Sequence, residues 1–374
     1  MTMLRFAKIG LLAVAAASSA FLPAVASDTI TVGTFNLENL FDTVDDPENP
    51  RDDTYLPLAA KDADRAAHDI RCERTNSGSQ FYAEQCRSLD WSETVYGQKL
   101  ANIAAVIKAM SPQPDVLVVP ETENAKVLND LVSDHLSGSG YAVINLDTSD
   151  KPVSRGIDVG ILTKLPVVVA PTAHKIDFKG DTKDCGVTRD IVHAGVEMPD
   201  GTALHVFGVH LPSGGNPFRF RTRSLLRLNE LKARLVKDGI AVAAGDFNVN
   251  CNEASTDQFA RLLYRGGWEA SSELVSGCRA PGSSKFFDRL QQWNTWSFLD
   301  MVVVSNGLSV GRPSDGNWFA DLGSLQTQVV TSKQVRLDDE GKGYVEPRRF
   351  DPETGLGVSD HWPVTMRLVR RRAD

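Results

Sequence analysis

The chain lacks the features that would place it among membrane, zinc-binding or repeat proteins. After its first residues, no stretch is apolar enough to cross a bilayer, which takes ~20 residues in a helix. No Cys and His residues have the spacing of a zinc site, and no internal repeat or long linker divides the chain. Basic charge is not in excess, because 40 Lys and Arg face 48 Asp and Glu, a net charge of −8. Bulk charge therefore disfavours nucleic acid binding, although a bound divalent cation and a local arginine cluster would offset that field.

The N-terminus has the composition of a secretory signal peptide. Arg5 and Lys8 precede a short apolar run, and residues 24–26 supply a small-x-small cleavage site. We therefore predict a signal peptide over residues 1–26; a membrane anchor, the alternative, would need a longer apolar core. Its removal takes away two cations, so 38 basic and 48 acidic side chains remain, a net charge of −10. A periplasmic or secreted protein follows from this prediction.

The remaining 348 residues (374 minus 26) are expected to form one domain over residues 27–374. Residues 42–90 are rich in Asp, Pro, Asn and Ser, which is typical of a long polar surface insertion. We expect a monomer with no stable membrane insertion.

The five cysteines of an exported chain suggest disulfides. Cys72 and Cys86 would close a short loop within the polar insertion, and Cys251 and Cys278 are the next candidate pair. Cys185 would then be left over. Connectivity itself cannot be read from the sequence.

Apolar runs indicate many strands and a few helices. Strands are predicted at 29–35, 116–119, 141–146, 158–162, 167–170, 191–196, 204–209, 240–244, 301–304 and 364–368. Helices are predicted from Asp90 or Ser92 to Met110, over 126–136 and over 218–236. Many strands and few helices, in this order along the chain, favour a β-sandwich core with helices outside.

Polar side chains stand at the ends of these strands, where loops can converge on one mouth. They are Asn36, Glu121, His210, Asp246, Asn248, Asp300, Asp360 and His361. Carboxylate and amide oxygens without thiolates suit a hard cation such as Mg²⁺, with Mn²⁺ or Ca²⁺ as alternatives. Such oxygens beside an imidazole are what a metal-assisted hydrolase needs.

Eight motifs in order resemble the endonuclease/exonuclease/phosphatase superfamily, which includes pancreatic deoxyribonuclease. The motifs are Thr34-Phe35-Asn36, Pro120-Glu121, Arg155-Gly156-Ile157-Asp158-Val159, Thr188-Arg189-Asp190-Ile191, Gly208-Val209-His210, Gly245-Asp246-Phe247-Asn248, Leu299-Asp300 and Ser359-Asp360-His361. The resemblance spans about residues 30–368. It implies a four-layer α/β/β/α sandwich of two mixed β-sheets with outer helices, and hydrolysis of a phosphate ester at the mouth of the sheets.

The resemblance also implies roles for the acids and amides. Glu121 looks like the principal metal carboxylate, with Asn36 beside it, and Asp360 looks like a second metal-associated carboxylate. Asp246 and Asn248 look like the groups that orient the attacking water and the phosphate. An aligned carboxylate can also deprotonate that water.

The histidines take complementary roles in this pattern. His361 looks like the imidazole that contacts the scissile phosphate, held in its tautomer by Asp300. A carboxylate on the other ring nitrogen favours the imidazolium needed beside phosphate. His210 matches a general acid for the leaving oxygen. Asp158 is a candidate partner for it, although a structural role beside Arg155 or Arg189 is the favoured interpretation of Asp158.

Arginines are expected to bind the anionic substrate, because the guanidinium fork suits phosphate geometry. Arg189 matches an arginine that approaches backbone phosphate in the deoxyribonuclease branch, and Arg155 is a second candidate. The cluster of Arg219, Arg221 and Arg223 is more typical of a solvated helix start, with a further basic rim as the alternative.

The favoured function is an exported Mg²⁺-dependent phosphodiesterase, with DNA as the expected substrate of an endonuclease or exonuclease. A sphingomyelinase-type phospholipase C would need an exposed aromatic hairpin, for which Phe286-Phe287 with Trp293 and Trp296 is the nearest candidate. A phosphomonoesterase acting on a small organic phosphate would need several Lys or Arg beyond the scissile phosphate. A non-catalytic binding protein on this scaffold would have lost key residues, and none is missing.

Overall fold

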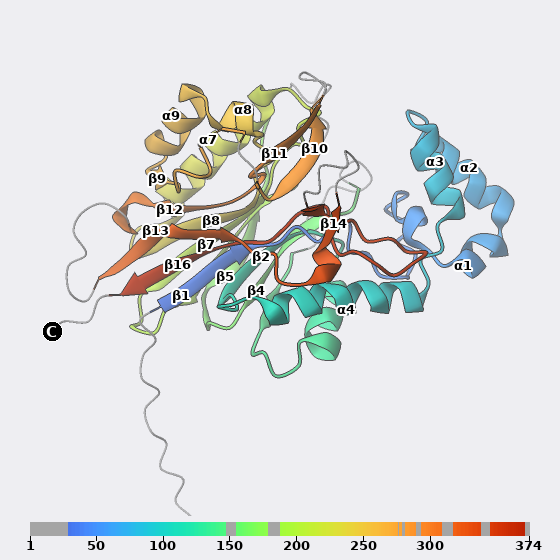
Figure 1. The fold of residues 1–374 in the computed structure, drawn as a ribbon, viewed down its shortest axis with the longest axis horizontal. Coiled ribbons are helices and arrows are strands. Elements are labelled where there is room, and N and C mark those ends of the chain that lie inside the picture. The colour runs from blue at the N-terminus through green and yellow to red at the C-terminus, as the bar shows by residue number, and fades with distance from the viewer. Residues whose placement is uncertain are drawn as a thin grey trace, which may run out of the picture.

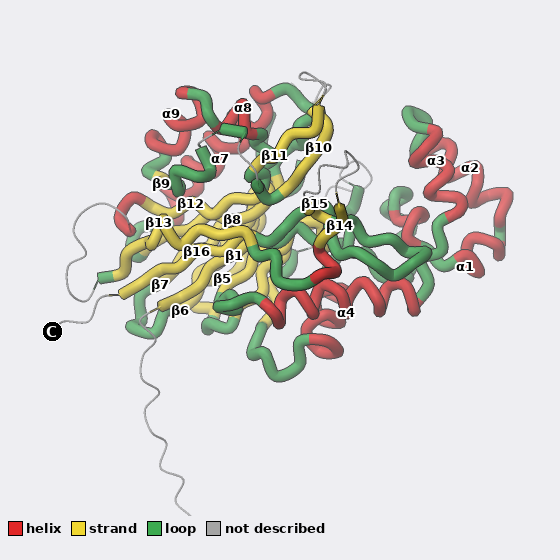
Figure 2. The backbone as a smooth tube through the Cα atoms, viewed as in Figure 1, coloured by secondary structure: helices red, strands yellow, loops and turns green. Residues whose placement is uncertain are grey.

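The computed structural model describes residues 29–146, 155–178, 188–275, 277–278, 281–288, 293–308, 317–337 and 345–370. The predicted signal peptide and Cys185 lie outside the described residues. Two six-stranded sheets form the centre of the molecule, and helices flank them (Figures 1 and 2). In the described part of the chain, no helix combines the length and the apolar character that a membrane span requires.

The first sheet has the strand order β13-β16-β1-β2-β4-β3. Its strands are β1 (Thr29–Thr34), β2 (Val116–Thr122), β3 (Ala142–Ile144), β4 (Asp158–Thr163), β13 (Trp318–Thr327) and β16 (Val364–Arg370). β1 and β2 are parallel, and the other neighbours are antiparallel. The central strands are buried on both faces, which is why they read as continuous apolar runs in the sequence.

The second sheet has the strand order β5-β6-β7-β8-β12-β9. Its strands are β5 (Val167–His174), β6 (Ile191–Glu197), β7 (Ala203–His210), β8 (Ile240–Asp246), β9 (Trp268–Glu269) and β12 (Asp300–Ser305). Only β7 and β8 are parallel among these neighbours. The amphipathic helix that joins them supplies the crossover that a parallel pair needs.

The two sheets pack face to face, and apolar residues of both share one buried core, among them Val32, Val118, Val206 and Val302. The first sheet is covered by α4 (Glu93–Ala109), α5 (Ala125–Asp130) and the π-helical turn η2 (Leu131–His135). The second is covered by α7 (Phe218–Leu235), α8 (Cys251–Ala254) and α9 (Asp257–Arg265). In Figure 1 the two helical layers lie on opposite sides of the sheets. The predicted four-layer sandwich is confirmed.

The polar insertion folds into helices rather than a loop. It contains η1 (Asp52–Tyr55), α1 (Leu58–Ala63), α2 (Arg65–Thr75) and α3 (Gln80–Ser88), which we call the helical lobe (residues 52–88). The lobe projects from one end of the sandwich (Figure 1). The predicted Cys72–Cys86 disulfide joins α2 to α3. Inside the lobe, the buried Lys61 ammonium donates to the carbonyl oxygens of Thr54, Cys86 and Leu89.

The second predicted disulfide, Cys251–Cys278, ties α8 to the loop that follows β9. Two disulfides in one chain point to an oxidising compartment. The remaining elements are the hairpins β10 (Ser284–Asp288) with β11 (Trp293–Ser297) and β14 (Val335–Leu337) with β15 (Val345–Pro347), and the short turns η3 (Asn306–Leu308) and η4 (Ser332–Gln334).

Candidate active site

Strand register places three of the predicted residues in one row across the second sheet. His210, the last residue of β7, is the parallel partner of Asp246, the last residue of β8. Asp246 is in turn the antiparallel partner of Asp300, the first residue of β12. Neighbouring strands lie about 4.8 Å apart, so the three side chains meet at one edge of the sheet.

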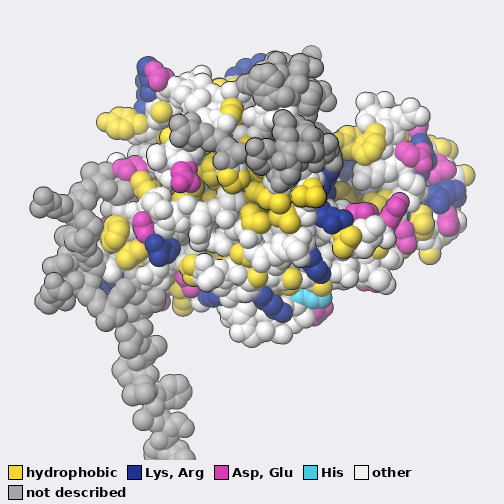
Figure 3. All heavy atoms as spheres, viewed as in Figure 1, with side chains coloured by type: hydrophobic (Ala, Val, Ile, Leu, Met, Phe, Trp, Pro, Cys, Tyr) yellow, Lys and Arg dark blue, Asp and Glu magenta, His cyan; other side chains and the backbone are white. Residues whose placement is uncertain are grey.

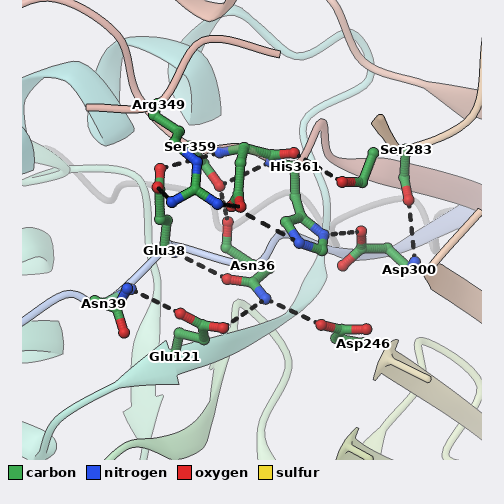
Figure 4. Close-up of polar contacts among 12 residues, drawn as sticks. Asn36, Glu38, Asn39, Glu121, Asp246, Ser283, Asp300, Arg349, Ser359 and His361 are labelled. Atoms are coloured by element: carbon green, nitrogen blue, oxygen red, sulfur yellow. Dashed lines mark hydrogen bonds and ion pairs between the residues drawn. The ribbon is translucent and has the colours of Figure 1, made fainter. Parts of the chain in front are cut away.

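Asn36, which directly follows β1 and Phe35, connects this row to the first sheet. Its Nδ2 atom donates to Glu121 Oε1 at 3.3 Å and to Asp246 Oδ2 at 3.2 Å (Figure 4). Asn36 is 1% exposed. The Asn36 amide therefore links the two sheets at their mouth, because it contacts one carboxylate from each sheet.

Glu121 points into the site because it is the extra residue of a β-bulge. Pro120 pairs with Val159 and Thr122 with Asp158, so Glu121 has no partner on β4. Its φ of 64° is positive, and bulges of this kind re-aim a side chain near active sites. In the described chain the non-glycine residues with positive φ are Glu38, Asn39, Glu121, Arg155 and Asn248. All of them lie at this site, where the surrounding contacts hold the strained backbone.

His361 is fixed by Asp300, as the sequence predicted. The Nδ1 atom of His361 donates to Asp300 Oδ2 at 2.6 Å. Burial would lower the pKa of His361, but the carboxylates of Asp300 and Asp360 outweigh it and raise that pKa well above its ordinary value. These carboxylates favour the imidazolium form, and Nε2 lies on the opposite side of the ring from Asp300.

His210 has the opposite electrostatic environment. Burial, together with the Arg189 cation, lowers the pKa of His210 well below its ordinary value. Its Nε2 atom lies 3.6 Å from Asp246 Oδ2 and 3.8 Å from Glu121 Oε1. Nδ1 makes no hydrogen bond within the described chain, so Asp158 does not orient His210 through that atom.

Asp246 is held at both carboxylate oxygens. Its Oδ1 atom accepts from the Asn248 backbone N–H at 2.8 Å, and its Oδ2 atom accepts from Asn36. Burial, with the nearby Asp300 and Glu121 carboxylates, raises the pKa of Asp246 to about 8. The Asn248 side chain is anchored by a 3.0 Å hydrogen bond to the Leu211 carbonyl oxygen.

The sequence did not single out Glu38 or Arg349, which the structure brings to Asp360. The Asp360 N–H donates to Glu38 Oε2 at 3.0 Å. Arg349 bridges the two acids, with Nη1 3.0 Å from Glu38 Oε1 and Nη2 2.5 Å from Asp360 Oδ2 (Figure 4). Burial and the Asp360 charge raise the pKa of Glu38 to about 8. Glu38 follows the same strand end as Asn36, so the strand-end pattern contained a signal for it; Arg349 lies in an irregular loop and had none.

Both arginines predicted to bind substrate belong to the site. Arg155 Nη2 lies 3.5 Å from Glu121 Oε1. Burial and the Arg155 charge lower the pKa of Arg189 to about 10, while Glu121, Asp246 and Asp158 act in the opposite sense. Burial alone would raise the pKa of Glu121, but Arg155 and the neighbouring cationic groups hold it well below its ordinary value.

Arg221 fits neither the solvated helix start expected for its cluster nor the alternative of a basic rim. Arg221 is 1% exposed, pairs with Glu253, and donates to the carbonyl oxygens of Pro212 and Ser213. It therefore holds the loop before α7 in place and is not available to substrate.

The donor set fits a hard divalent cation. Asn36, Glu38, Glu121 and Asp360 offer amide and carboxylate oxygens at one mouth, without thiolates. Burial raises the pKa values of Glu38 and Asp246, and the neighbouring carboxylates raise them further by crowded negative charge, which a cation would offset. These carboxylates do not form a tight cage. Within the described residues, only His68, Cys72 and Cys86 bring three ligand atoms within 4.8 Å of one another, and those two cysteines are joined in a disulfide. An open site suits Mg²⁺, which usually keeps several waters.

Comparisons with known proteins agree with this architecture. A search of curated proteins found no match. An endonuclease/exonuclease/phosphatase family protein from Bacteroides thetaiotaomicron is similar with a TM-score of 0.54 at 18% identity, covering 91% of this chain and 98% of that chain. A mannosyl-6-phosphatase from the same organism gives 0.52 at 18% identity, covering 91% and 99%. TDP2 from D. rerio, in complex with a single-strand DNA product, gives 0.53 at 14% identity, covering 91% and 99%. At these identities the likeness establishes the fold.

A sequence model of one family settles membership independently. The model described as Endonuclease/Exonuclease/phosphatase family matches residues 74–370, most of the chain. Its members hydrolyse phosphoesters and generally use divalent metal ions. The chain therefore belongs to the endonuclease/exonuclease/phosphatase family.

Proposed function

We propose that the protein is an exported, divalent-metal-dependent phosphodiesterase and that its substrate is DNA. The observation that carries this proposal is the meeting of the His361–Asp300 pair, Asp246 and the Asn36–Glu121 contact at one edge of the two sheets. These groups supply an imidazolium, a carboxylate base and metal ligands within one mouth.

Glu121 and Asn36 would hold the cation, with Glu38 and Asp360 close by. When bound, a divalent ion neutralises the non-bridging oxygens of a phosphodiester and its leaving alkoxide. Arg155 and Arg189 would hold the phosphate through their guanidinium groups.

Asp246 is suited to accept a proton from the attacking water. Burial and the neighbouring carboxylates raise its pKa to about 8, and a bound cation would offset their charge, lower that pKa and leave the group ionised as a base near neutral pH. The Asn36 amide and the Asn248 backbone fix its direction. As the water oxygen bonds to phosphorus, its proton passes to Asp246 and the alkoxide leaves on the opposite side.

His361 would donate from Nε2 to a phosphate oxygen, because Asp300 occupies Nδ1 and stabilises the imidazolium. A neutral His210 is a weak acid, so the general-acid role is not part of this proposal. Its Nε2 atom, between Asp246 and Glu121, would instead position those two carboxylates.

A phosphomonoesterase acting on a small organic phosphate is the second candidate. Arg51, Arg155 and Arg349 line a pocket beside the site, and clustered cations of this kind would bind additional anionic groups. The likeness of the fold to a mannosyl-6-phosphatase is compatible with this alternative.

A substrate panel tests the proposal. The purified mature protein, with Mg²⁺ or Mn²⁺, is given plasmid DNA, single-stranded DNA, RNA, sphingomyelin, inositol phosphates, a sugar phosphate and a chromogenic aryl diester. Cleavage of DNA and of the diester, lost in Asp246→Ala, supports a DNA phosphodiesterase. Turnover of monoesters alone would replace it with the second candidate, and no turnover at all would favour a binding protein on this scaffold.

Export is proposed from the disulfides and from the N-terminal sequence. Two disulfides persist only where thiols are not kept reduced. N-terminal sequencing of protein recovered from outside the cytoplasm should begin at Ser27, as the predicted cleavage site requires; a chain that still begins at Met1 would contradict cleavage.

A further inference from the structure

A cavity of about 500 Å³ opens beside the active site and extends to the helical lobe. Glu121 and Asp360 line its inner end, while Phe81 and Tyr82 of α3 line the end formed by the lobe. Figure 3 shows the surface hollowed between the sandwich and the lobe, with hydrophobic and basic side chains near the hollow. A volume of this size accommodates a small-molecule-sized group rather than a duplex.

The aromatic pair in this cavity is exposed without a packing role in the core. Phe81 is 70% exposed and Tyr82 is 56% exposed, and their ring centroids lie 5.4 Å apart at an interplanar angle of 71°. Other aromatic residues of the cavity are packed, because Tyr55 stacks on Phe41 and meets the edge of Trp91. The disulfide Cys72–Cys86 braces α3, which carries the exposed pair. Two open ring faces are thus presented from a braced helix.

Positive charge lines the same cavity. Arg51 and Arg155 both line it, and the charge that acts on the Arg51 guanidinium is that of Arg155 rather than that of an acid. Burial and the like charge of Arg155 lower the pKa of Arg51. Two adjacent cations of this kind repel each other and would gain from a phosphate placed between them.

We propose that this cavity holds a nucleotide next to the scissile phosphate of a single-stranded nucleic acid, with its base against Phe81 and Tyr82. Its flanking phosphate would lie on Arg51 and on Arg155, whose guanidinium would bridge the flanking and scissile phosphates. This subsite rests on the proposed phosphodiesterase function and deepens it. A nucleotide combines a planar ring with an adjacent anion, which is the combination that the cavity presents. A sugar or inositol phosphate has no aromatic face for the pair, and a lipid tail would leave the arginines without anions.

Binding without turnover tests the subsite. In chelator, fluorescence anisotropy measures the affinity of the full-length mature chain for a short labelled single-stranded DNA of mixed sequence. Phe81→Ala/Tyr82→Ala should weaken binding about fivefold or more, the range that stacking on aromatic side chains gives. Tyr264→Ala is the matched control, because Tyr264 is an 84% exposed aromatic residue on α9 and should have no effect. Arg51→Ala should weaken binding and flatten its dependence on salt.

Two further measurements complete the test. If Phe81→Ala/Tyr82→Ala unfolds the helical lobe, Phe81→Leu/Tyr82→Leu replaces it, because leucine keeps the apolar bulk without a ring face. This second double variant should show the same loss of affinity for single-stranded DNA. An RNA of the same sequence identifies the sugar that the site accepts, and the matching duplex should bind more weakly. The subsite would be overturned if the wild type and both double variants bound single strands with equal affinity. It would also be overturned if the wild type co-sedimented with sphingomyelin vesicles and the double variants did not, because the aromatic pair would then bind a membrane surface.

Turnover separates this proposal from the proposed function. In the double variants kcat/KM for single-stranded DNA should fall by the same factor as affinity, while kcat/KM for the small aryl diester stays at the wild-type value. A parallel loss on both substrates would mean that the pair supports the catalytic centre and would refute the subsite alone. A wild type that hydrolyses only monoesters would instead refute the phosphodiesterase assignment, and with it the subsite.

Discussion

The Nδ1 atom of His361 lies 2.6 Å from Oδ2 of Asp300, although the two residues are 61 positions apart in the chain. Each partner is also anchored through its backbone. The Asp300 N–H donates to Ser283 Oγ at 3.0 Å, and the His361 N–H donates to Ser359 Oγ at 3.1 Å. The Ser359 hydroxyl in turn donates to the Asn36 carbonyl oxygen at 2.7 Å. The imidazole therefore has one orientation before any substrate arrives.

The first prediction concerns this pair. His361→Ala should lower kcat by at least ~10²-fold, the range of groups that stabilise transition-state charge. Asp300→Asn should lower kcat by about tenfold or more with KM little changed, because it removes the charge that stabilises the imidazolium. Steady-state kinetics on the aryl diester measure both. In the double variant the losses should not multiply, since Asp300 acts through His361; fully multiplicative losses would show that Asp300 acts elsewhere.

A second prediction is that chelator abolishes activity while the fold persists. The carboxylate and amide oxygens are positioned by strand ends and by the Glu121 bulge, which do not depend on an ion. Circular dichroism should give the same spectrum with and without chelator, and added Mg²⁺ should restore turnover. Glu121→Gln should raise the Mg²⁺ concentration needed for half-maximal activity, measured also as weaker binding by calorimetry. Turnover that survives chelator would remove the cation from the mechanism.

A third prediction concerns the disulfide that links α2 to α3. The Cys72–Cys86 bridge closes a segment with a sequence separation of 14, for which loop entropy predicts a contribution of ~3 kcal/mol. Cys72→Ser/Cys86→Ser should therefore loosen the helical lobe first, seen as faster amide hydrogen exchange over residues 52–88. Cys251→Ser/Cys278→Ser should leave exchange in the lobe unchanged. Loss of protection across the sheets at the same time as the lobe would show that the lobe does not open separately.

A fourth prediction concerns pH and a histidine pair outside the site. His193 Nε2 lies 3.0 Å from His205 Nδ1, and their rings stack with centroids 5.2 Å apart. Burial, followed by the charges of His205 and His174, lowers the pKa of His193 from 6.5 to about 4. The unfolded chain therefore binds a proton below pH 6.5 that the folded chain resists until about pH 4. The contribution of His193 to the unfolding free energy is therefore fully present above pH 6.5 and is lost as the pH falls toward 4.

Thermal unfolding between pH 8 and pH 5 measures this effect. His193→Gln, which can keep a hydrogen bond to His205, should reduce the loss of stability on acidification by on the order of 1–2 kcal/mol. His135→Gln on η2 is the control outside the cluster and should keep the wild-type dependence. An unchanged slope in His193→Gln would assign the acid sensitivity to other groups.

The strand ends of the candidate site were predictable because a buried strand leaves its terminal polar residue at the sheet edge. Asn36, Asp246 and Asp300 follow this rule. The pairing of Asp246 with both His210 and Asp300 was not readable, since register depends on which strands become neighbours. Glu38 follows the same strand end, but a turn with a φ of 51° at Glu38 brings it to Asp360, and that turn was not readable from the sequence.

The helical lobe was missed for a different reason. Its helices are short. A disulfide joins α2 to α3, and the hydrogen bonds of Lys61 join α1 to the C-terminal end of α3, so that these helices do not depend on a wide apolar face. Long-range bridges leave no periodic signal in the sequence. By contrast α4 showed its apolar spacing at Leu100, Ile103 and Ile107, and its predicted cap, Ser92, accepts from the Val95 N–H.

The last prediction concerns Gly245, which precedes Asp246 at the end of β8. Its φ is +140°, and a Cβ atom there would lie 2.0 Å from the carbonyl oxygen of Val209, its partner on β7. Gly245→Ala must therefore push β7 away from β8, which separates His210 from Asp246. We expect a loss of about 3 kcal/mol or more in unfolding free energy, and a fall in kcat in the fraction that stays folded.

Gly78→Ala is the matched control, because a Cβ atom at Gly78 meets nothing within 4 Å. Urea unfolding compares the stabilities of the two variants, and kcat on the aryl diester is measured well below the urea midpoint of each variant. Wild-type stability in Gly245→Ala would mean that β7 and β8 can separate without cost, and wild-type kcat would mean that catalysis tolerates movement of Asp246 relative to His210. Either result would contradict the tight pairing on which the row of catalytic side chains depends.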